Sequence, residues 1–208
     1  MPIELWITFV ITSSVLLVIP GPTILTVISY SLAHGRRANI PLVSAVALGD
    51  TAALVLSLLG LGALLATSAF WFTAVKIVGA LYLLYLGFKL LRAGISPARI
   101  MDVPPRGTTW RLFANTFMVT ALNPKGIVFF IAFLPQFISP AVPAGPQLWI
   151  LGTTFVVLGA ANAALYAVFA ASARRLLSTR RAQWGFNFVG GSLLSAAAIL
   201  ALLARRPA

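Results

Sequence analysis

The chain has 208 residues, of which 60% are hydrophobic and only 9% are charged, and its mean hydropathy is +1.00. A soluble domain carries about 25% charged residues, so this composition excludes an ordinary soluble enzyme and a disordered chain. It indicates an all-α membrane protein, because helices satisfy their own backbone hydrogen bonds in lipid. The net charge of +12 fits basic loops between apolar runs better than a nucleic-acid-binding surface. Cysteine is absent and histidine occurs once, so we predict no bound metal and no cofactor.

Six apolar stretches predict six transmembrane helices of about 20 residues or more. They cover approximately residues 5–30, 40–66, 70–91, 112–137, 147–173 and 183–203. The fourth and fifth are separated at residues 139–146, because no single helix tolerates three prolines and a glycine within that segment. The first is interpreted as a retained span, since no basic residue precedes it and it is too long for the apolar core of a signal peptide.

The distribution of basic residues predicts the orientation of the spans. The first, third and fifth connections with their flanks hold 11 arginines and lysines, whereas the second and fourth connections hold none. The positive-inside rule places the basic connections in the cytoplasm and therefore both termini on the outer side. Arg205 and Arg206 near the C-terminus are the one feature that opposes this orientation.

Helix-breaking residues interrupt the first and fourth spans. They are Pro20, Gly21 and Pro22 in the first span and Pro124 and Gly126 in the fourth. Each proline removes a backbone hydrogen bond, and a helix broken within lipid needs a protein cavity where the freed groups find partners. One break alone fits a passive kink, but two breaks at similar depth are typical of an inverted-repeat transporter. We therefore predict a single transporter domain at 1–208, with a first repeat at 1–91, a cytoplasmic loop at 92–111 and a second repeat at 112–208.

Asp50 is the only acidic residue inside a predicted span. It lies about ten residues into the second span, a depth of about 15 Å that brings it near the bilayer centre. A charge at this depth costs at least about 2.5 kcal/mol, so we expect this carboxyl group to exchange a proton and to couple transport to it. The alternative is a structural acid paired with a lysine.

Two lysines also lie inside predicted spans. Lys125 is at a depth comparable to that of Asp50, where it could pair with this acid. It could instead bind an anionic substrate group such as a carboxylate, helped by the amide of Asn123 and the broken helix beside it. Lys76 lies six residues into the third span and either extends to the headgroups or faces the cavity. The sequence leaves open which lysine pairs with Asp50.

Glycines predict close packing of the fifth span. Gly152 and Gly159 lie seven residues apart on one helix face, and Tyr166 continues that face. Small residues at such spacing let helices approach closely. The strict GxxxG pattern is absent, so that type of dimer seam has no support, and the sequence leaves a homo-oligomer open.

Three motifs together resemble the LysE/RhtB family of amino-acid exporters. They are Pro20-Gly21-Pro22, the run from Lys76 to Gly87, and the run from Asn123 to Phe130 followed by Leu134, Pro135, Gln136 and Phe137. The resemblance covers nearly the whole chain, and the third motif is the most specific. It implies a bacterial inner-membrane protein that exports amino acids such as lysine, homoserine, homoserine lactone, threonine or leucine in exchange for protons.

The residues that the resemblance marks for testing are Pro20, Gly21, Pro22, Asp50, Lys76, Asn123, Pro124 and Lys125. The chain departs from the family locally, because Ala38 and Asn39 stand where members often have another glycine.

The resemblance implies an amino acid, protons and the lipid bilayer as partners, and no nucleic acid. Two other functions remain open at the level of sequence. A divalent-cation exporter would use a related fold, but a single acid within the spans makes a poor cation site. An intramembrane enzyme would need a nucleophile and base, or metal ligands, facing each other, and the spans hold neither cysteine nor histidine. We therefore expect a transporter and not an enzyme.

Overall fold

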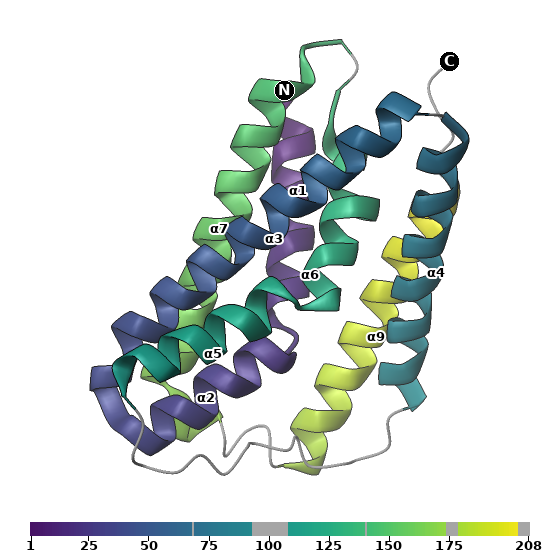
Figure 1. Cartoon of the computed structure of the whole chain (residues 1–208). Coiled ribbons are helices and arrows are strands. Elements are labelled where there is room, and N and C mark those ends of the chain that lie inside the picture. The colour runs from purple at the N-terminus through teal and green to yellow at the C-terminus, as the bar shows by residue number, and fades with distance from the viewer. Residues whose placement is uncertain (68, 93–107, 140, 174–178, 204–208) are drawn as a thin grey trace.

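The computed structural model describes residues 1–67, 69–92, 108–139, 141–173 and 179–203. Within these ranges the chain forms helices and connecting segments and no strand, which confirms the predicted all-α class (Figure 1). Three helical stretches are long and apolar enough to cross a membrane: 22–60, 109–137 and 144–168. Large apolar side chains cover the outside of the bundle, including Leu56, Val157 and Leu165, each at least 60% exposed. A soluble surface rarely carries so many, so the protein is a membrane protein.

The first predicted span is broken, as expected. Helix α1 (Ile3–Val18) ends before Pro20, and α2 (Pro22–His34) begins at a proline in its first turn, where the missing N–H costs nothing. Between them Gly21 is extended, with φ −117° and ψ −170°. Since Pro22 has no N–H, the carbonyl of Val18 loses the donor that a continuous helix would supply.

The second and third predicted spans are continuous helices. After the short 3₁₀ turn η1 (Gly35–Ala38), α3 runs over Asn39–Thr67 and α4 over Ala69–Arg92. Both agree with the predicted limits to within one residue, because their ends follow the change from apolar to basic or small polar residues.

The fourth predicted span is divided into several pieces. Helix α5 (Thr109–Ala121) ends before Asn123, and α6 (Pro124–Val128) begins directly after it. A π-helical turn, η2 (Phe129–Phe133), and a 3₁₀ turn, η3 (Leu134–Phe137), complete this segment. The break at Pro124 is therefore confirmed, while the π turn had no predicted counterpart.

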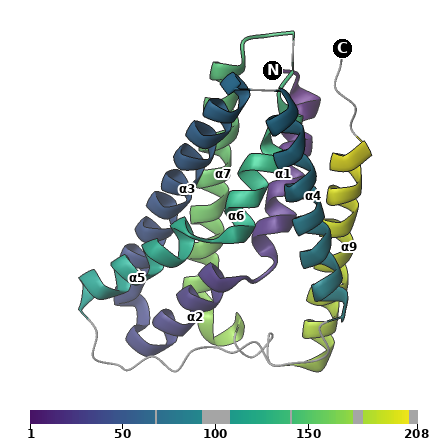
Figure 2. The ribbon, with the colours of Figure 1, turned by 45° about the vertical axis from the view of Figure 1, so that its right-hand side comes forward.

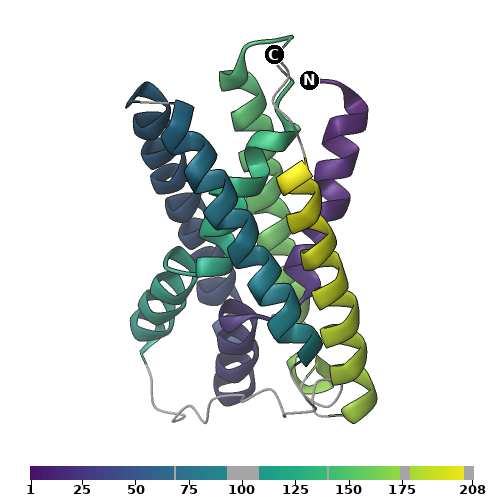
Figure 3. The ribbon, with the colours of Figure 1, turned by 90° about the vertical axis from the view of Figure 1, so that its right-hand side faces the viewer.

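The last two predicted spans correspond to α7 (Ala144–Val168) and α9 (Arg180–Leu203). Helix α7 begins three residues before the predicted limit, and Phe169 interrupts it with ψ 24°, but residues 170–173 are helical again, up to the predicted end of the span. Helices α4 and α9 lie side by side in all three views (Figures 1–3). Their seam depends on glycines, since a methyl group added at Gly191 would lie 2.7 Å from the carbonyl oxygen of Gly87.

The interior is divided between an aromatic and an aliphatic cluster. Toward the end where the chain begins, phenylalanines of α1, α6–η3 and α7 pack together, with ring centroids 4.8–6.2 Å apart. They are Phe9, Phe129, Phe130, Phe133, Phe137 and Phe155. Toward the opposite end, Val27, Tyr30, Leu42, Val46 and Leu112 form the core of α2, α3 and α5.

The described basic residues other than Lys76 and Lys125 gather at one end of the molecule. They occupy η1, the last turns of α4 and the first turns of α5 and α9, which all lie in the lower part of Figure 1. They are Arg36, Arg37, Lys89, Arg92, Arg111, Arg180 and Arg181. The fold therefore collects the predicted cytoplasmic charges on one side, while the orientation in the membrane stays a prediction.

Candidate functional site between the two helix breaks

The breaks in the first and fourth predicted spans meet at one small buried cavity. It has a volume of about 40 Å³ and is lined from α1, α2, α3, α6 and α7. Its polar wall consists of Thr23, Asp50, Asn123, Lys125 and Asn162. Residues from both halves of the sequence thus converge at the point where the backbone is irregular, which is where a membrane protein can bind a polar solute.

The ammonium group of Lys125 lies at the end of α1. Its Nζ donates a hydrogen bond of 2.8 Å to the carbonyl oxygen of Ile19, the residue that follows the last turn of α1. A helix C-terminus carries partial negative charge and favours a cation. Gly21 lies against the same side chain, because a methyl group added there would be 3.8 Å from Cδ of Lys125. Lys125 therefore connects the fourth-span break to the first-span break.

Two side chains of α7 satisfy the neighbouring carbonyls of α1. Nδ2 of Asn162 donates to the carbonyl of Leu17 at 3.0 Å, and the hydroxyl of Tyr166 donates to that of Val18 at 2.9 Å. An unsatisfied carbonyl within lipid costs several kcal/mol. The break after α1 is thus stabilised by side-chain donors from α6 and α7 at three successive carbonyls.

Asp50 lies on α3 and reaches the cavity past a glycine of α7. A methyl group added at Gly159 would lie only 2.6 Å from Oδ2 of Asp50, so the carboxyl group occupies the space that a side chain would fill. Asp50 is 8% exposed. Lys125 lines the same cavity.

Asn123 holds the two helix N-termini together. Its Oδ1 accepts a hydrogen bond of 3.1 Å from the backbone N–H of Lys125, which caps α6. Its Nδ2 donates to Oγ1 of Thr23 in the first turn of α2, at 3.2 Å. Both α2 and α6 therefore begin at the cavity and direct their partial positive ends toward it.

The structure brings most of the predicted site residues together. Asp50, Asn123, Lys125, Gly21 and Gly126 all line the cavity. Pro20, Pro22 and Pro124 form the two breaks beside it. Lys76 belongs to α4, but its side chain lies outside the described residues. Of the two candidate partners of Asp50, Lys125 lines the cavity together with it, and the part of Lys76 stays a prediction.

Two donors were not predicted as site residues. Asn162 and Tyr166 follow Gly159 by three and seven residues, so helical periodicity places them on the face that packs against α3 and α1. That spacing could have identified both. Thr23 carries no comparable signal. In the part of the chain that the structure describes, no group of three or more His, Asp or Glu residues could hold a metal ion.

A polar cavity enclosed by two broken helices is the arrangement found in secondary membrane transporters. The family model described as LysE type translocator matches residues 14–204, and the chain therefore belongs to this family. No solved structure matches the chain.

Relatives of similar length cover almost the entire chain. An uncharacterized membrane protein of Vibrio cholerae is 30% identical over 205 residues, covering 99% of this chain and 100% of its own. A homoserine/homoserine lactone efflux protein of Salmonella typhimurium is 32% identical over 207 residues, covering 99% of each chain. A leucine efflux protein of Salmonella choleraesuis is 29% identical and covers 94% of each chain.

Proposed function

We propose that the protein exports an amino acid or a close derivative across the bacterial inner membrane in exchange for protons. The observation that carries this proposal is the cavity between two helix breaks, with a carboxyl group and an ammonium group on its wall. Membership of the translocator family supports transport, and relatives named for the efflux of homoserine, homoserine lactone and leucine support the substrate class.

We also propose that six spans form two inverted repeats of three. In each half a broken segment (α1–α2, or α5–α6) is followed by a long helix (α3 or α7) and then by a helix of the outer pair (α4 or α9). Asp50 on α3 and Asn162 on α7 reach the same cavity, which supports a symmetric relation between the halves. Three spans per repeat give the halves opposite orientations, with both termini on the outer side.

The charges in the cavity fit both ends of a zwitterion. The ammonium of Lys125 and the N-termini of α2 and α6 would bind the carboxylate of an amino acid. The carboxylate of Asp50 would bind its amino group, and Asn162 offers a neutral donor and acceptor beside it. For Lys125 to bind the substrate, its Nζ must leave the carbonyl of Ile19, so substrate binding would release the connection between the two breaks.

The cavity as described is too small for an amino acid. A volume of about 40 Å³ is close to the space of one water molecule, about 30 Å³. Small-molecule sites measure about 300–1,000 Å³, so the cavity must widen to hold a substrate. The phenylalanine cluster closes it toward one end and the core around Tyr30, Leu42 and Leu112 toward the other. We propose that these two clusters open alternately, with the breaks acting as hinges.

Exchange follows if the substrate and a proton compete for Asp50. The ionised carboxylate binds the amino group of the substrate, and a proton that arrives from the outer side displaces it. The protonated carboxyl then returns to the inner side and loses its proton to the cytoplasm before the next substrate binds. One amino acid leaves for each proton that enters in this scheme.

Efflux from proteoliposomes tests the proposal. Vesicles loaded with a labelled amino acid should release it faster when the external medium is acidified, and Asp50→Asn should abolish the acceleration. Glu4→Gln is the matched control, because it removes an exposed carboxyl at the start of α1. Release at the rate of empty-membrane leakage for all common amino acids would refute the substrate class. An unchanged response in Asp50→Asn would remove Asp50 from the coupling step.

A further inference from the structure

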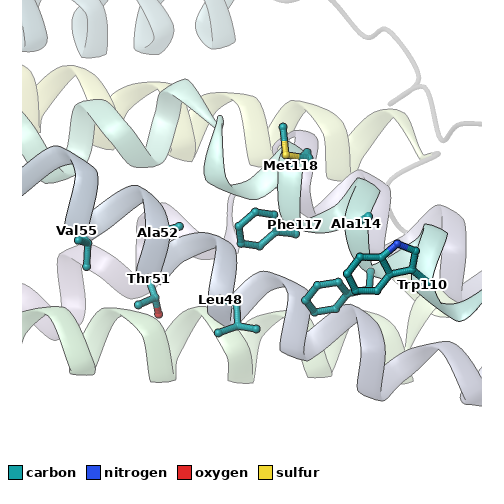
Figure 4. A pocket seen from close by; sticks show the side chains of 9 residues that line it. Leu48, Thr51, Ala52, Val55, Trp110, Ala114, Phe117 and Met118 are labelled. Carbon is teal, nitrogen blue, oxygen red and sulfur yellow. The ribbon is translucent and has the colours of Figure 1, made fainter.

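We propose that a groove between α3 and α5 binds an acyl chain of an anionic phospholipid, whose phosphate is held by arginines at the basic end of the groove. The groove has a volume of about 650 Å³ and lies on the outside of the bundle. Figure 4 shows its wall, formed on α3 by Leu48, Thr51 and Val55 and on α5 by Trp110, Phe117 and Met118. It does not include any residue of the transport cavity.

The wall of the groove suits a hydrocarbon chain. Thr51 donates its hydroxyl to the carbonyl of Ala47 at 2.7 Å, so this polar group is satisfied within α3. Along α5 the rings of Trp110 and Phe113 stack at 5.6 Å and 18°, and those of Phe113 and Phe117 at 6.2 Å and 11°. Three nearly parallel rings form a flat apolar side against which an extended chain can lie.

The groove follows most of the length of α5. Trp110 lies in the first turn of α5, and Met118 lies in its last turn, next to the helix break at Leu122 and Asn123. These eight residues span about 12 Å along the axis of α5, which is inclined to the long helices of the bundle in Figures 1 and 2. The groove therefore offers an acyl chain an apolar path of this length that starts at the basic end of α5.

Exposed arginines near the groove favour an anionic lipid over a second copy of the chain as its occupant. Arg111 follows Trp110 directly and is exposed. Arg36 and Arg37 in η1 are also exposed, and the neighbouring Ala38 packs in one cluster with Leu112 of α5. A symmetric contact through this face would bring like charges together, whereas a phosphate can accept hydrogen bonds from several guanidinium groups.

Native mass spectrometry after reconstitution tests this site. Protein extracted from phosphatidylcholine vesicles that contain phosphatidylglycerol should retain one phosphatidylglycerol in preference to phosphatidylcholine. Ala114→Trp fills the groove and should abolish this retention, while Val157→Trp adds the same side chain on exposed α7 and should not. Arg111→Gln should weaken retention about tenfold, the value of one charge-assisted hydrogen bond. Arg181→Gln in the first turn of α9 is the control for Arg111→Gln and should leave retention unchanged. If Ala114→Trp fails to fold, Arg111→Gln alone still tests the proposal.

Three results would overturn the proposal. One is equal retention by Ala114→Trp and the wild type, and another is retention of phosphatidylcholine as strongly as phosphatidylglycerol. The third comes from cross-linking through an introduced cysteine, which is the only cysteine in the variant because the chain has none of its own. If Leu48→Cys forms a disulfide-linked dimer in the membrane, the groove is occupied by a second copy and not by lipid.

Discussion

Gly152 and Gly159 offer a matched pair of substitutions where α7 packs against α3. Both glycines are buried on one face of α7. A methyl group added at Gly159 would lie 2.6 Å from Oδ2 of Asp50, and one added at Gly152 would lie 2.6 Å from Cδ2 of Leu54. The steric overlap is the same at both positions, but only the first involves the proposed coupling carboxyl.

The expected cost of each substitution follows from this overlap. Both distances are 0.8 Å shorter than the 3.4 Å at which ordinary van der Waals contact begins. Overpacking of a buried site costs about 1–3 kcal/mol, and because both contacted atoms are the ends of side chains that can rotate away, Gly159→Ala and Gly152→Ala should each lose about 1 kcal/mol, the low end of this range. Gly159→Ala must in addition displace the carboxyl of Asp50 from the cavity wall, whereas Gly152→Ala displaces only a leucine methyl.

Thermal unfolding in detergent and efflux from proteoliposomes separate the two effects. Both variants should unfold at lower temperature than the wild type. Only Gly159→Ala should raise the KM for the exported amino acid and change the dependence of efflux on external pH. If the two variants show the same KM and the same pH profile, the contact between Gly159 and Asp50 has no bearing on transport and the reasoning fails.

Three further substitutions test other contacts of the site and the fold. Lys125→Met should reduce efflux at least about tenfold, because it removes the ammonium group that bonds the carbonyl of Ile19 and, as proposed, binds the substrate. A KM equal to that of the wild type would contradict the substrate-binding role of Lys125. Tyr166→Phe should destabilise the protein by about 1–3 kcal/mol by leaving the carbonyl of Val18 without its donor, and unchanged thermal unfolding would show that another group satisfies this carbonyl. Gln147→Ala should destabilise by about 1–3 kcal/mol, since this buried side chain bonds four backbone groups of residues 139–143; stability equal to that of the wild type would show that those bonds contribute nothing.

Local features of the sequence predicted the helices and the breaks. Apolar runs bounded by basic residues located α3 and α4 to within one residue. Proline lacks an N–H wherever it occurs, so the breaks at Pro22 and Pro124 could be placed without knowledge of the fold. The turn residue Phe169, which divides the helical stretch 144–173 in two, was not predicted, because an uninterrupted run of apolar residues gives no signal there.

The composition of the cavity could be predicted only in part. Asp50 and Lys125 were identified because a charged side chain within lipid is energetically costly and therefore indicates a functional site. The hydrogen bonds that join Thr23 to Asn123 and Asn162 to the carbonyl of Leu17 connect residues 100 and 145 positions apart, and a single sequence does not show which distant segments meet. The same applies to the seam of Gly87 and Gly191, which joins two helices far apart in the chain.

Proton movement driven by an amino-acid gradient tests the central claim most directly. Proteoliposomes loaded with the exported amino acid and a pH-sensitive dye should acidify inside when diluted into medium without it, because each departing molecule exchanges for an incoming proton. Asp50→Asn should give no acidification, while Glu4→Gln should match the wild type. Efflux from the wild type without acidification, or acidification that persists in Asp50→Asn, would contradict proton exchange at the cavity between the two breaks.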